Sequence, residues 1–128
     1  MSAPRVLVVE DDPSVRGLLH TVLSAEGYDV STASDGLAGL VSVSSTRPAL
    51  VLLDLMMPDL GGVRVIEELR EDPELAATPI IVVTGRVESV PAMRDLLGDD
   101  AVLVKPFAVA DLLARVAALT GGPGGTAS

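Results

Sequence analysis

With 128 residues, the chain has the size of one domain with a buried core. Its formal net charge of −9 and its two aromatic residues disfavour nucleic-acid binding, because phosphate backbones attract Lys and Arg and bases stack on aromatic rings. The chain has no cysteine and no apolar run near the roughly 20 residues of a membrane helix, so we expect a cytoplasmic protein without disulfides.

The first predicted strand covers residues 6–9 and leads into a helix. Asp12 suits the cap of that helix, Pro13 suits its first position, and Gly27 favours its end. We expect its buried stripe from the apolar residues at helical spacing, which are Val15, Leu18, Leu19 and Val22. The more polar, alternating residues 28–33 predict a half-exposed edge strand.

The middle of the chain predicts a second helix of low propensity, because glycines and serines are frequent between Asp35-Gly36 and Arg47-Pro48. A strongly apolar strand follows at residues 50–53. A loop with proline and glycine then leads to a third helix. The residues expected to share the buried face of that helix are Val63, Ile66 and Leu69.

The last third predicts a strand at residues 80–83 and another at residues 101–104. The helix between them is expected to be short or mobile, because Pro91 restricts its start and leaves little more than residues 92–97. A final helix is expected to bury Val109, Leu112, Leu113 and Val116. The glycine-rich residues 121–128 indicate a flexible linker or tail. We therefore expect one domain over residues 4–120, built from five strand–helix units.

Polar residues stand where four of these apolar strands end. They are Glu10, Asp11 and Asp12 after the first, Asp54 after the third, Thr84 after the fourth, and Lys105 after the fifth. Because the carboxyl ends of parallel strands share one edge of a sheet, we expect these side chains to meet in one pocket. Clustered carboxylates with a hydroxyl and an ammonium group suit a divalent cation and a phosphoryl group.

Four segments resemble the signature blocks of the response-regulator receiver family, namely residues 8–13, 53–58, 83–85 and 104–107. The resemblance covers residues 4–120, with the blocks in the family's order and spacing. It implies an α/β, doubly wound, flavodoxin-like (βα)5 fold, with a five-stranded parallel sheet in the order 2-1-3-4-5 and helices on both faces. It also implies a two-component signalling phosphoprotein, which takes a phosphoryl group from a sensor histidine kinase or a histidine phosphotransfer protein and then changes conformation.

The same resemblance assigns the reacting groups. Asp54 is the implied phosphoacceptor, Lys105 the cation that pairs with it and then with a phosphoryl oxygen, and Thr84 the hydroxyl that swings toward the phosphate. Such a protein catalyses only its own phosphorylation and dephosphorylation, so we do not expect an enzyme with a separate substrate. Phosphoryl transfer to a carboxylate brings two anions together, and a metal ion is therefore required.

The implied metal is Mg²⁺, which prefers carboxylate, carbonyl and water ligands. Asp11, Asp54 and the backbone carbonyl of Met56 match the family's direct ligands, and Glu10 is expected to act through water. Asp12 is expected to lie outside the site as a helix cap.

Departures from the family pattern concern the output of the switch. Val102 stands where the family usually has a tyrosine or phenylalanine, so readout is expected to differ from rotation of an aromatic ring. Gly85 follows Thr84 where alanine is usual, which favours a more mobile loop. Met56 and Arg86 occupy the two positions that tune phosphoryl lifetime in this family.

Two other classes of protein stay open. A pseudo-receiver would keep the fold as an interaction module without phosphorylation, which Val102 mildly favours. A phosphohydrolase of the haloacid dehalogenase type needs a second acid at the position of Met56. The single histidine, His20, lies off the apolar stripe of its helix and is expected to be exposed, so it is not proposed as a ligand.

Partners follow from the resemblance alone. A downstream effector domain or protein is expected to carry any DNA contact, and none is expected from this domain. The final helix, with Asp111 and Arg115, resembles that of receivers attached to winged-helix transcription factors. We nevertheless expect a monomer, because Val102 and Pro91 replace residues that hold the dimer face of those receivers.

Overall fold

The computed structural model describes residues 3–57 and 61–123. Five parallel strands form one sheet in the order β2-β1-β3-β4-β5, which confirms the predicted doubly wound topology. The strands are β1 (Arg5–Val9), β2 (Asp29–Ala33), β3 (Leu50–Asp54), β4 (Ile80–Thr84) and β5 (Val102–Val104). Each observed strand agrees with its predicted range to within one residue at either end.

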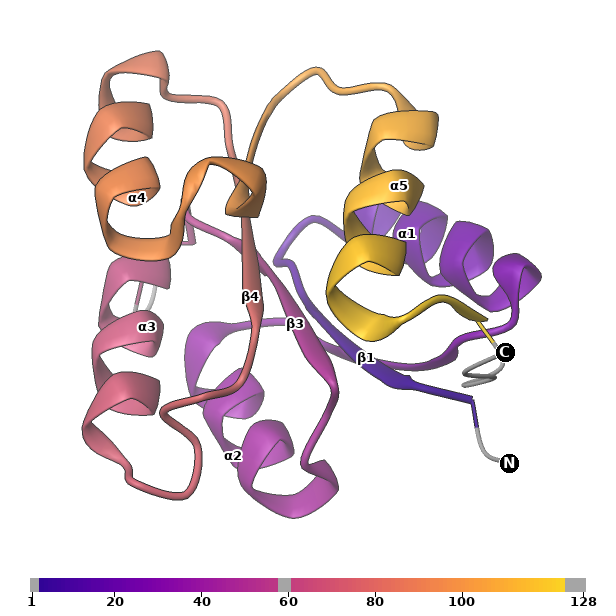
Figure 1. Ribbon diagram of the computed structural model, residues 1–128, viewed down its shortest axis with the longest axis horizontal. Coiled ribbons are helices and arrows are strands. Elements are labelled where there is room, and N and C mark those ends of the chain that lie inside the picture. Colours follow the sequence, from indigo (N-terminus) through magenta and orange to yellow (C-terminus); the bar gives the residue numbers. More distant parts are fainter. Residues whose placement is uncertain (1–2, 58–60, 124–128) are drawn as a thin grey trace.

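Helices cover both faces of the sheet. Figure 1 shows α1 and α5 together on one side and α2, α3 and α4 on the other. Their bounds are α1 (Pro13–Glu26), α2 (Gly36–Thr46), α3 (Gly62–Glu71), α4 (Val90–Leu97) and α5 (Val109–Thr120), with short 3₁₀ turns η1 (Val87–Ser89) and η2 (Asp99–Ala101) flanking α4. Within the described residues, no helix is long and apolar enough to span a bilayer.

The apolar strands are explained by this sandwich of layers, because alternate residues of a strand point to opposite faces and both faces are buried. In β1, Val6 and Val8 belong to the core beneath α1 and α5, whereas Leu7 and Val9 belong to the core beneath α2, α3 and α4. Val102 is 2% exposed and packs in the second of these cores. The valine at the expected switch position is therefore a core residue.

The predicted signals at the ends of α1 are confirmed. The Asp12 carboxylate accepts hydrogen bonds from the backbone N–H of Ser14 and Val15, and Pro13 opens the helix. Gly27 ends it with a φ of 105°, a left-handed conformation that glycine adopts without strain. This cap fixes the start of α1 directly after the acidic residues that follow β1.

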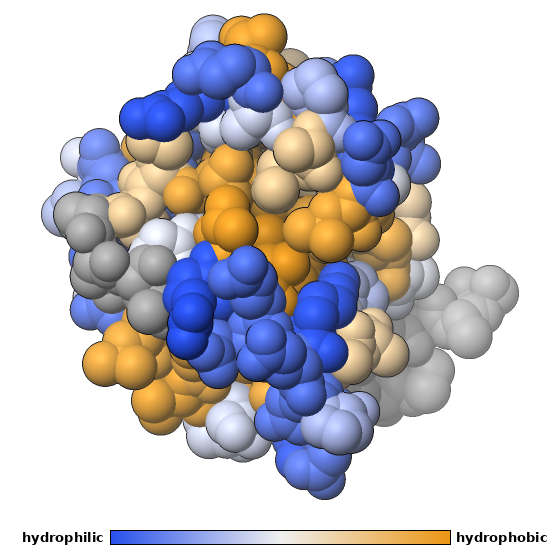
Figure 2. Space-filling model, turned by 90° about the vertical axis from the view of Figure 1, so that its left-hand side faces the viewer, coloured by the Kyte–Doolittle hydropathy of each residue, from blue (hydrophilic) through white to orange (hydrophobic). Residues whose placement is uncertain are grey.

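Three predicted core positions are wrong, because helical spacing does not say where the edge of a buried stripe lies. Leu18 is 55% exposed, Val63 is 44% exposed and Val109 is 41% exposed. Leu23 in α1 and Val65 in α3 are buried instead. Leu18 and Val109 line a shallow apolar groove with Phe107, and the face that carries α3 and α4 likewise exposes apolar surface between hydrophilic side chains (Figure 2).

The helix around Pro91 is longer than the sequence suggests. It starts at Val90, with Pro91 in its first turn, where a missing backbone N–H breaks no helical hydrogen bond. The turn η1 precedes it directly and bridges β4 and α4. Of the flexible tail expected at residues 121–128, the part from residue 124 onward lies outside the described residues, as does Pro58.

Alanine substitutions of two glycines, Gly62 and Gly17, should change the free energy of unfolding in opposite directions. A Cβ on Gly62 would lie 2.6 Å from the Leu55 Cα, so Gly62→Ala must displace backbone and should lower the free energy of unfolding by about 1–3 kcal/mol. Gly17 lies in α1, and apart from its chain neighbours and the backbone of its own helix no described atom lies within 4 Å of its Cβ position. Gly17→Ala should therefore raise that free energy by about 0.5–1 kcal/mol. Urea unfolding of both variants measures this, and destabilisation by Gly17→Ala would contradict the packing described.

Candidate functional site

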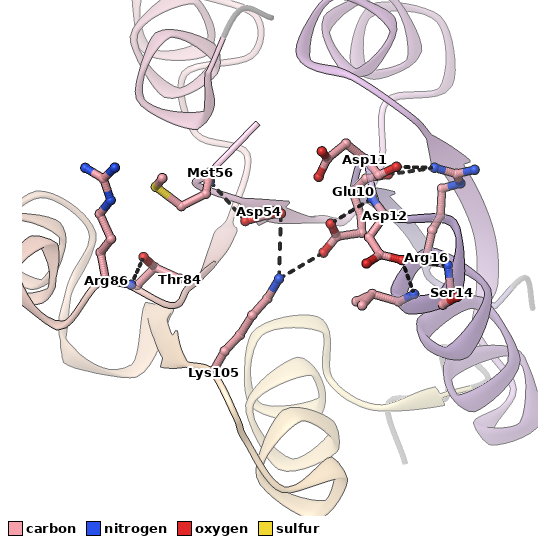
Figure 3. Close-up of polar contacts among 11 residues, drawn as sticks. Glu10, Asp11, Asp12, Ser14, Arg16, Asp54, Met56, Thr84, Arg86 and Lys105 are labelled. Carbon is pink, nitrogen blue, oxygen red and sulfur yellow. Dashed lines mark hydrogen bonds and ion pairs between the residues drawn. The ribbon is translucent and has the colours of Figure 1, made fainter. Parts of the chain in front are cut away.

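The carboxyl ends of the central strands bring the predicted site residues to one edge of the sheet (Figure 3). Asp54 is the last residue of β3, Glu10 follows β1 and Lys105 follows β5. Asp54 is 5% exposed and Glu10 is 2% exposed. Because buried carboxylates are costly unless they are paired, the surroundings of these two groups decide what the site can do.

Lys105 supplies the positive charge at this edge. Its Nζ lies 3.7 Å from Asp54 Oδ2 and 3.4 Å from Glu10 Oε1. The backbone N–H of Met56 donates a hydrogen bond of 3.0 Å to Asp54 Oδ1, so both carboxylate oxygens of Asp54 have partners. One ammonium group therefore faces two buried carboxyl groups.

Three acidic groups are close enough to share a cation. Oxygen atoms of Glu10, Asp11 and Asp54 all lie within 4.8 Å of one another. Oxygen ligands of this kind suit a hard divalent ion such as Mg²⁺, and Lys105 alone leaves the cluster with excess negative charge. The donor set therefore fits the expected metal, whereas a role for the Met56 carbonyl stays a prediction.

Glu10 is the group whose protonation the site changes most clearly. The pKa of the Glu10 carboxyl is raised from its usual 4.5 to about 7, chiefly by burial and further by the hydrogen bonding and negative charge of Asp54. The backbone N–H of Asp12 and the charge of Lys105 oppose the rise in pKa. A proton on Glu10 would therefore relieve the carboxylate repulsion when no cation is bound.

This raised pKa predicts a pH dependence. Between pH 4.5 and pH 7 the native state binds more protons at Glu10 than the unfolded state does, so stability falls as pH rises through this window. In EDTA, the wild type should lose unfolding free energy between these two pH values relative to Glu10→Gln, as measured by urea unfolding. A constant difference between the two proteins would contradict the raised pKa.

Thr84 is fully buried at the end of β4, but its hydroxyl is turned to its own loop. The backbone N–H of Arg86 donates to Thr84 Oγ1 over 3.0 Å, and Ser89 Oγ lies 3.3 Å from the same atom. Among the contacts of the described residues, none joins Thr84 Oγ1 to Asp54. The structure thus places Thr84 at the predicted edge without bringing its hydroxyl onto the acceptor.

Asp12 lies outside the carboxylate cluster, as predicted. Arg16 and Ser89 make contacts near the site that the sequence did not predict. One Arg16 nitrogen donates to the backbone carbonyls of Glu10 and Asp11, over 2.9 and 3.3 Å. This contact fixes the loop that carries two of the acidic groups. Its signal in the sequence is weak, because any Arg in the first turns of a helix can point elsewhere. His20 is exposed, as predicted.

Comparison with known proteins gives one consistent picture. Residues 6–117 match the family model of the response regulator receiver domain. The DNA-binding response regulator MtrA of Mycolicibacterium smegmatis is 42% identical over 115 residues, which are 89% of this chain and 49% of that protein. The dual master transcriptional regulator RpaA of a Synechocystis strain is 39% identical over 118 residues, 91% of this chain and 48% of that protein.

Solved structures agree with the sequence relatives. The chemotaxis protein CheY4 of Vibrio cholerae has a TM-score of 0.82 at 28% identity, covering 92% of this chain and 99% of its own. A Francisella receiver domain, of response regulator 1452, has a TM-score of 0.80 at 30% identity, covering 91% of this chain and 95% of its own. The chain spans about half the length of the curated relatives it matches.

Proposed function

Because this chain belongs to the response regulator receiver domain family, we propose that it accepts a phosphoryl group on Asp54 from a phosphohistidine. The observation that carries the proposal is the buried Asp54 carboxylate, with Lys105 Nζ 3.7 Å away and an acidic cluster suited to Mg²⁺ beside it. A nucleophile, a fixed cation and a metal site are the parts that phosphoryl transfer to a carboxylate needs.

In the proposed reaction, an Asp54 oxygen forms a bond to phosphorus while the bond from phosphorus to the donor histidine nitrogen breaks. The electron pair of that broken bond stays on the imidazole, which leaves. Lys105 lies between Asp54 and Glu10 and can follow the developing charge from the carboxylate to a phosphoryl oxygen. Asp11 and Asp54, with Glu10 acting through water, would hold Mg²⁺, which would further neutralise the phosphoryl charge.

The alternatives have less support. A pseudo-receiver is disfavoured because the acceptor, the lysine and the threonine are all at the edge of the sheet. A hydrolase of the haloacid dehalogenase type needs a second acid two residues after the nucleophile, and this chain has Met56 at that position. The experiment that separates the three is incubation with acetyl phosphate and Mg²⁺ followed by intact-protein mass spectrometry. The proposed function predicts a persistent gain of one phosphoryl group; no gain or rapid turnover would refute it.

We further propose a sensor histidine kinase or a histidine phosphotransfer protein as donor, in the cytoplasm. By their names, MtrA and RpaA are DNA-binding regulators. This chain covers about half of the length of each. An effector domain or protein is therefore the proposed recipient of the signal, with DNA contact outside residues 4–120. The net charge of −9 fits a domain that does not itself bind DNA.

Phosphorylation is expected to leave the domain monomeric. Arg115, which could form ion pairs across a dimer face, donates instead to three backbone carbonyls of its own chain, including that of Val102 at 2.7 Å. Exposed ion pairs contribute only about 0–1 kcal/mol each, too little for association when several are missing. Light scattering should give the monomer mass with and without beryllofluoride and Mg²⁺; a doubled mass on activation would contradict this.

A further inference from the structure

The hydroxyl of Thr84 is engaged by a residue that has no role in the chemistry described so far. Ser89 is half-buried in η1, five residues after Thr84, and its Oγ lies 3.3 Å from Thr84 Oγ1. Ser89 Oγ also donates to the backbone carbonyl of Arg86 over 2.8 Å. The loop between β4 and α4 therefore closes on the buried threonine by a small network of hydrogen bonds.

The direction of the hydrogen bond between the two hydroxyl groups follows from the number of protons. A serine hydroxyl has one proton, and that of Ser89 goes to the Arg86 carbonyl, which is the shorter contact. Ser89 must then accept from Thr84. Among the described residues, the other contact of Thr84 Oγ1 is the Arg86 N–H, which can only donate. The single proton of Thr84 is thus directed at Ser89 and away from Asp54.

We infer that Ser89 is a positioning residue that holds the Thr84 hydroxyl in the unphosphorylated arrangement and opposes phosphoryl binding at Asp54. The inference rests on the proposed function, in which Thr84 donates its proton to a phosphoryl oxygen on Asp54. Thr84 cannot make that bond while its only proton is shared with Ser89. Each binding event must therefore break this contact, and the free energy of the lost hydrogen bond weakens binding.

Removing the acceptor should strengthen binding of a phosphoryl mimic. Ser89→Ala leaves the buried Thr84 hydroxyl without a recipient for its proton, so binding no longer breaks a hydrogen bond. We expect beryllofluoride, in the presence of Mg²⁺, to bind Ser89→Ala about two- to fivefold more tightly than the wild type, as measured by isothermal titration calorimetry. Affinity for Mg²⁺ alone should not change, because Ser89 has no described contact with the acidic cluster.

Three controls separate positioning from a general effect on the loop. Ser89→Thr keeps the hydroxyl and should restore wild-type affinity. In a Thr84→Val background, Ser89→Ala should have no effect, because no threonine proton remains to be held. Ser45→Ala removes a hydroxyl that, within the part of the chain that the structure describes, donates to carbonyls of its own helix. This variant should match the wild type.

The outcomes distinguish this inference from the proposed function. If wild-type protein does not bind beryllofluoride at all, the proposed function fails and the inference fails with it. If the wild type binds but Ser89→Ala binds equally or more weakly, only the role of Ser89 is overturned. Tighter binding by Ser89→Ala that persists in the Thr84→Val background would also overturn it, because the effect would not pass through Thr84.

Discussion

Asp54→Asn should abolish phosphorylation by acetyl phosphate while the protein stays folded. An asparagine side chain has nearly the shape of aspartate, but its neutral amide is a poor nucleophile toward phosphorus. Lys105 would keep its contact with Glu10, whose Oε1 lies 3.4 Å from Nζ, so no buried charge is left unpaired. Loss of one carboxylate also reduces the repulsion within the acidic cluster, and stability without metal should not fall.

Intact-protein mass spectrometry and circular dichroism measure the two parts of this prediction. The matched control is Asp29→Asn, which removes an exposed carboxylate at the start of β2, at the opposite end of the strands. That variant should be phosphorylated like the wild type. Phosphorylation of a folded Asp54→Asn protein would show that the acceptor has been assigned to the wrong residue.

Two neighbouring aspartates should respond very differently to alanine substitution. Asp11 contributes an oxygen to the acidic cluster, so Asp11→Ala should lower Mg²⁺ affinity by on the order of tenfold or more. Asp12 accepts the backbone N–H groups of Ser14 and Val15 at the start of α1. Asp12→Ala should therefore lower the unfolding free energy by about 1 kcal/mol and leave Mg²⁺ affinity near that of the wild type.

Calorimetric titration with Mg²⁺ and urea unfolding with and without the ion measure both effects. Since the ion binds only the assembled site, saturating Mg²⁺ should stabilise the wild type and Asp12→Ala by similar amounts, and Asp11→Ala much less. Equal losses of Mg²⁺ affinity in the two variants would show that the metal ligands are misplaced.

The sequence predicted the fold well because the physical signals were strong. Fully buried parallel strands require near-continuous apolar runs, and these runs end at the residues that form the site. The register of helices was predicted less well. Leu18 and Val63 are apolar and correctly spaced, yet each lies at the exposed edge of its helix, which depends on packing that periodicity does not encode.

In the candidate site, too, some residues were predicted from the sequence and others were not. Glu10, Asp11, Asp54 and Lys105 were predicted because strand order alone brings them together. Arg16 and Ser89 were missed because they act through backbone carbonyls and a loop hydroxyl, contacts that depend on the path of the chain. The domain limits at residues 4 and 120 stay predictions, although the family match over residues 6–117 lies within them.

The most direct test of the phosphoacceptor site is a crystal structure of the protein with Mg²⁺ and beryllofluoride. We expect beryllium bound to a carboxylate oxygen of Asp54 and Mg²⁺ at the cluster of Glu10, Asp11 and Asp54. We also expect Lys105 and the Thr84 hydroxyl to be turned to fluorine atoms. Beryllofluoride on another side chain, or Mg²⁺ bound away from this cluster, would contradict it.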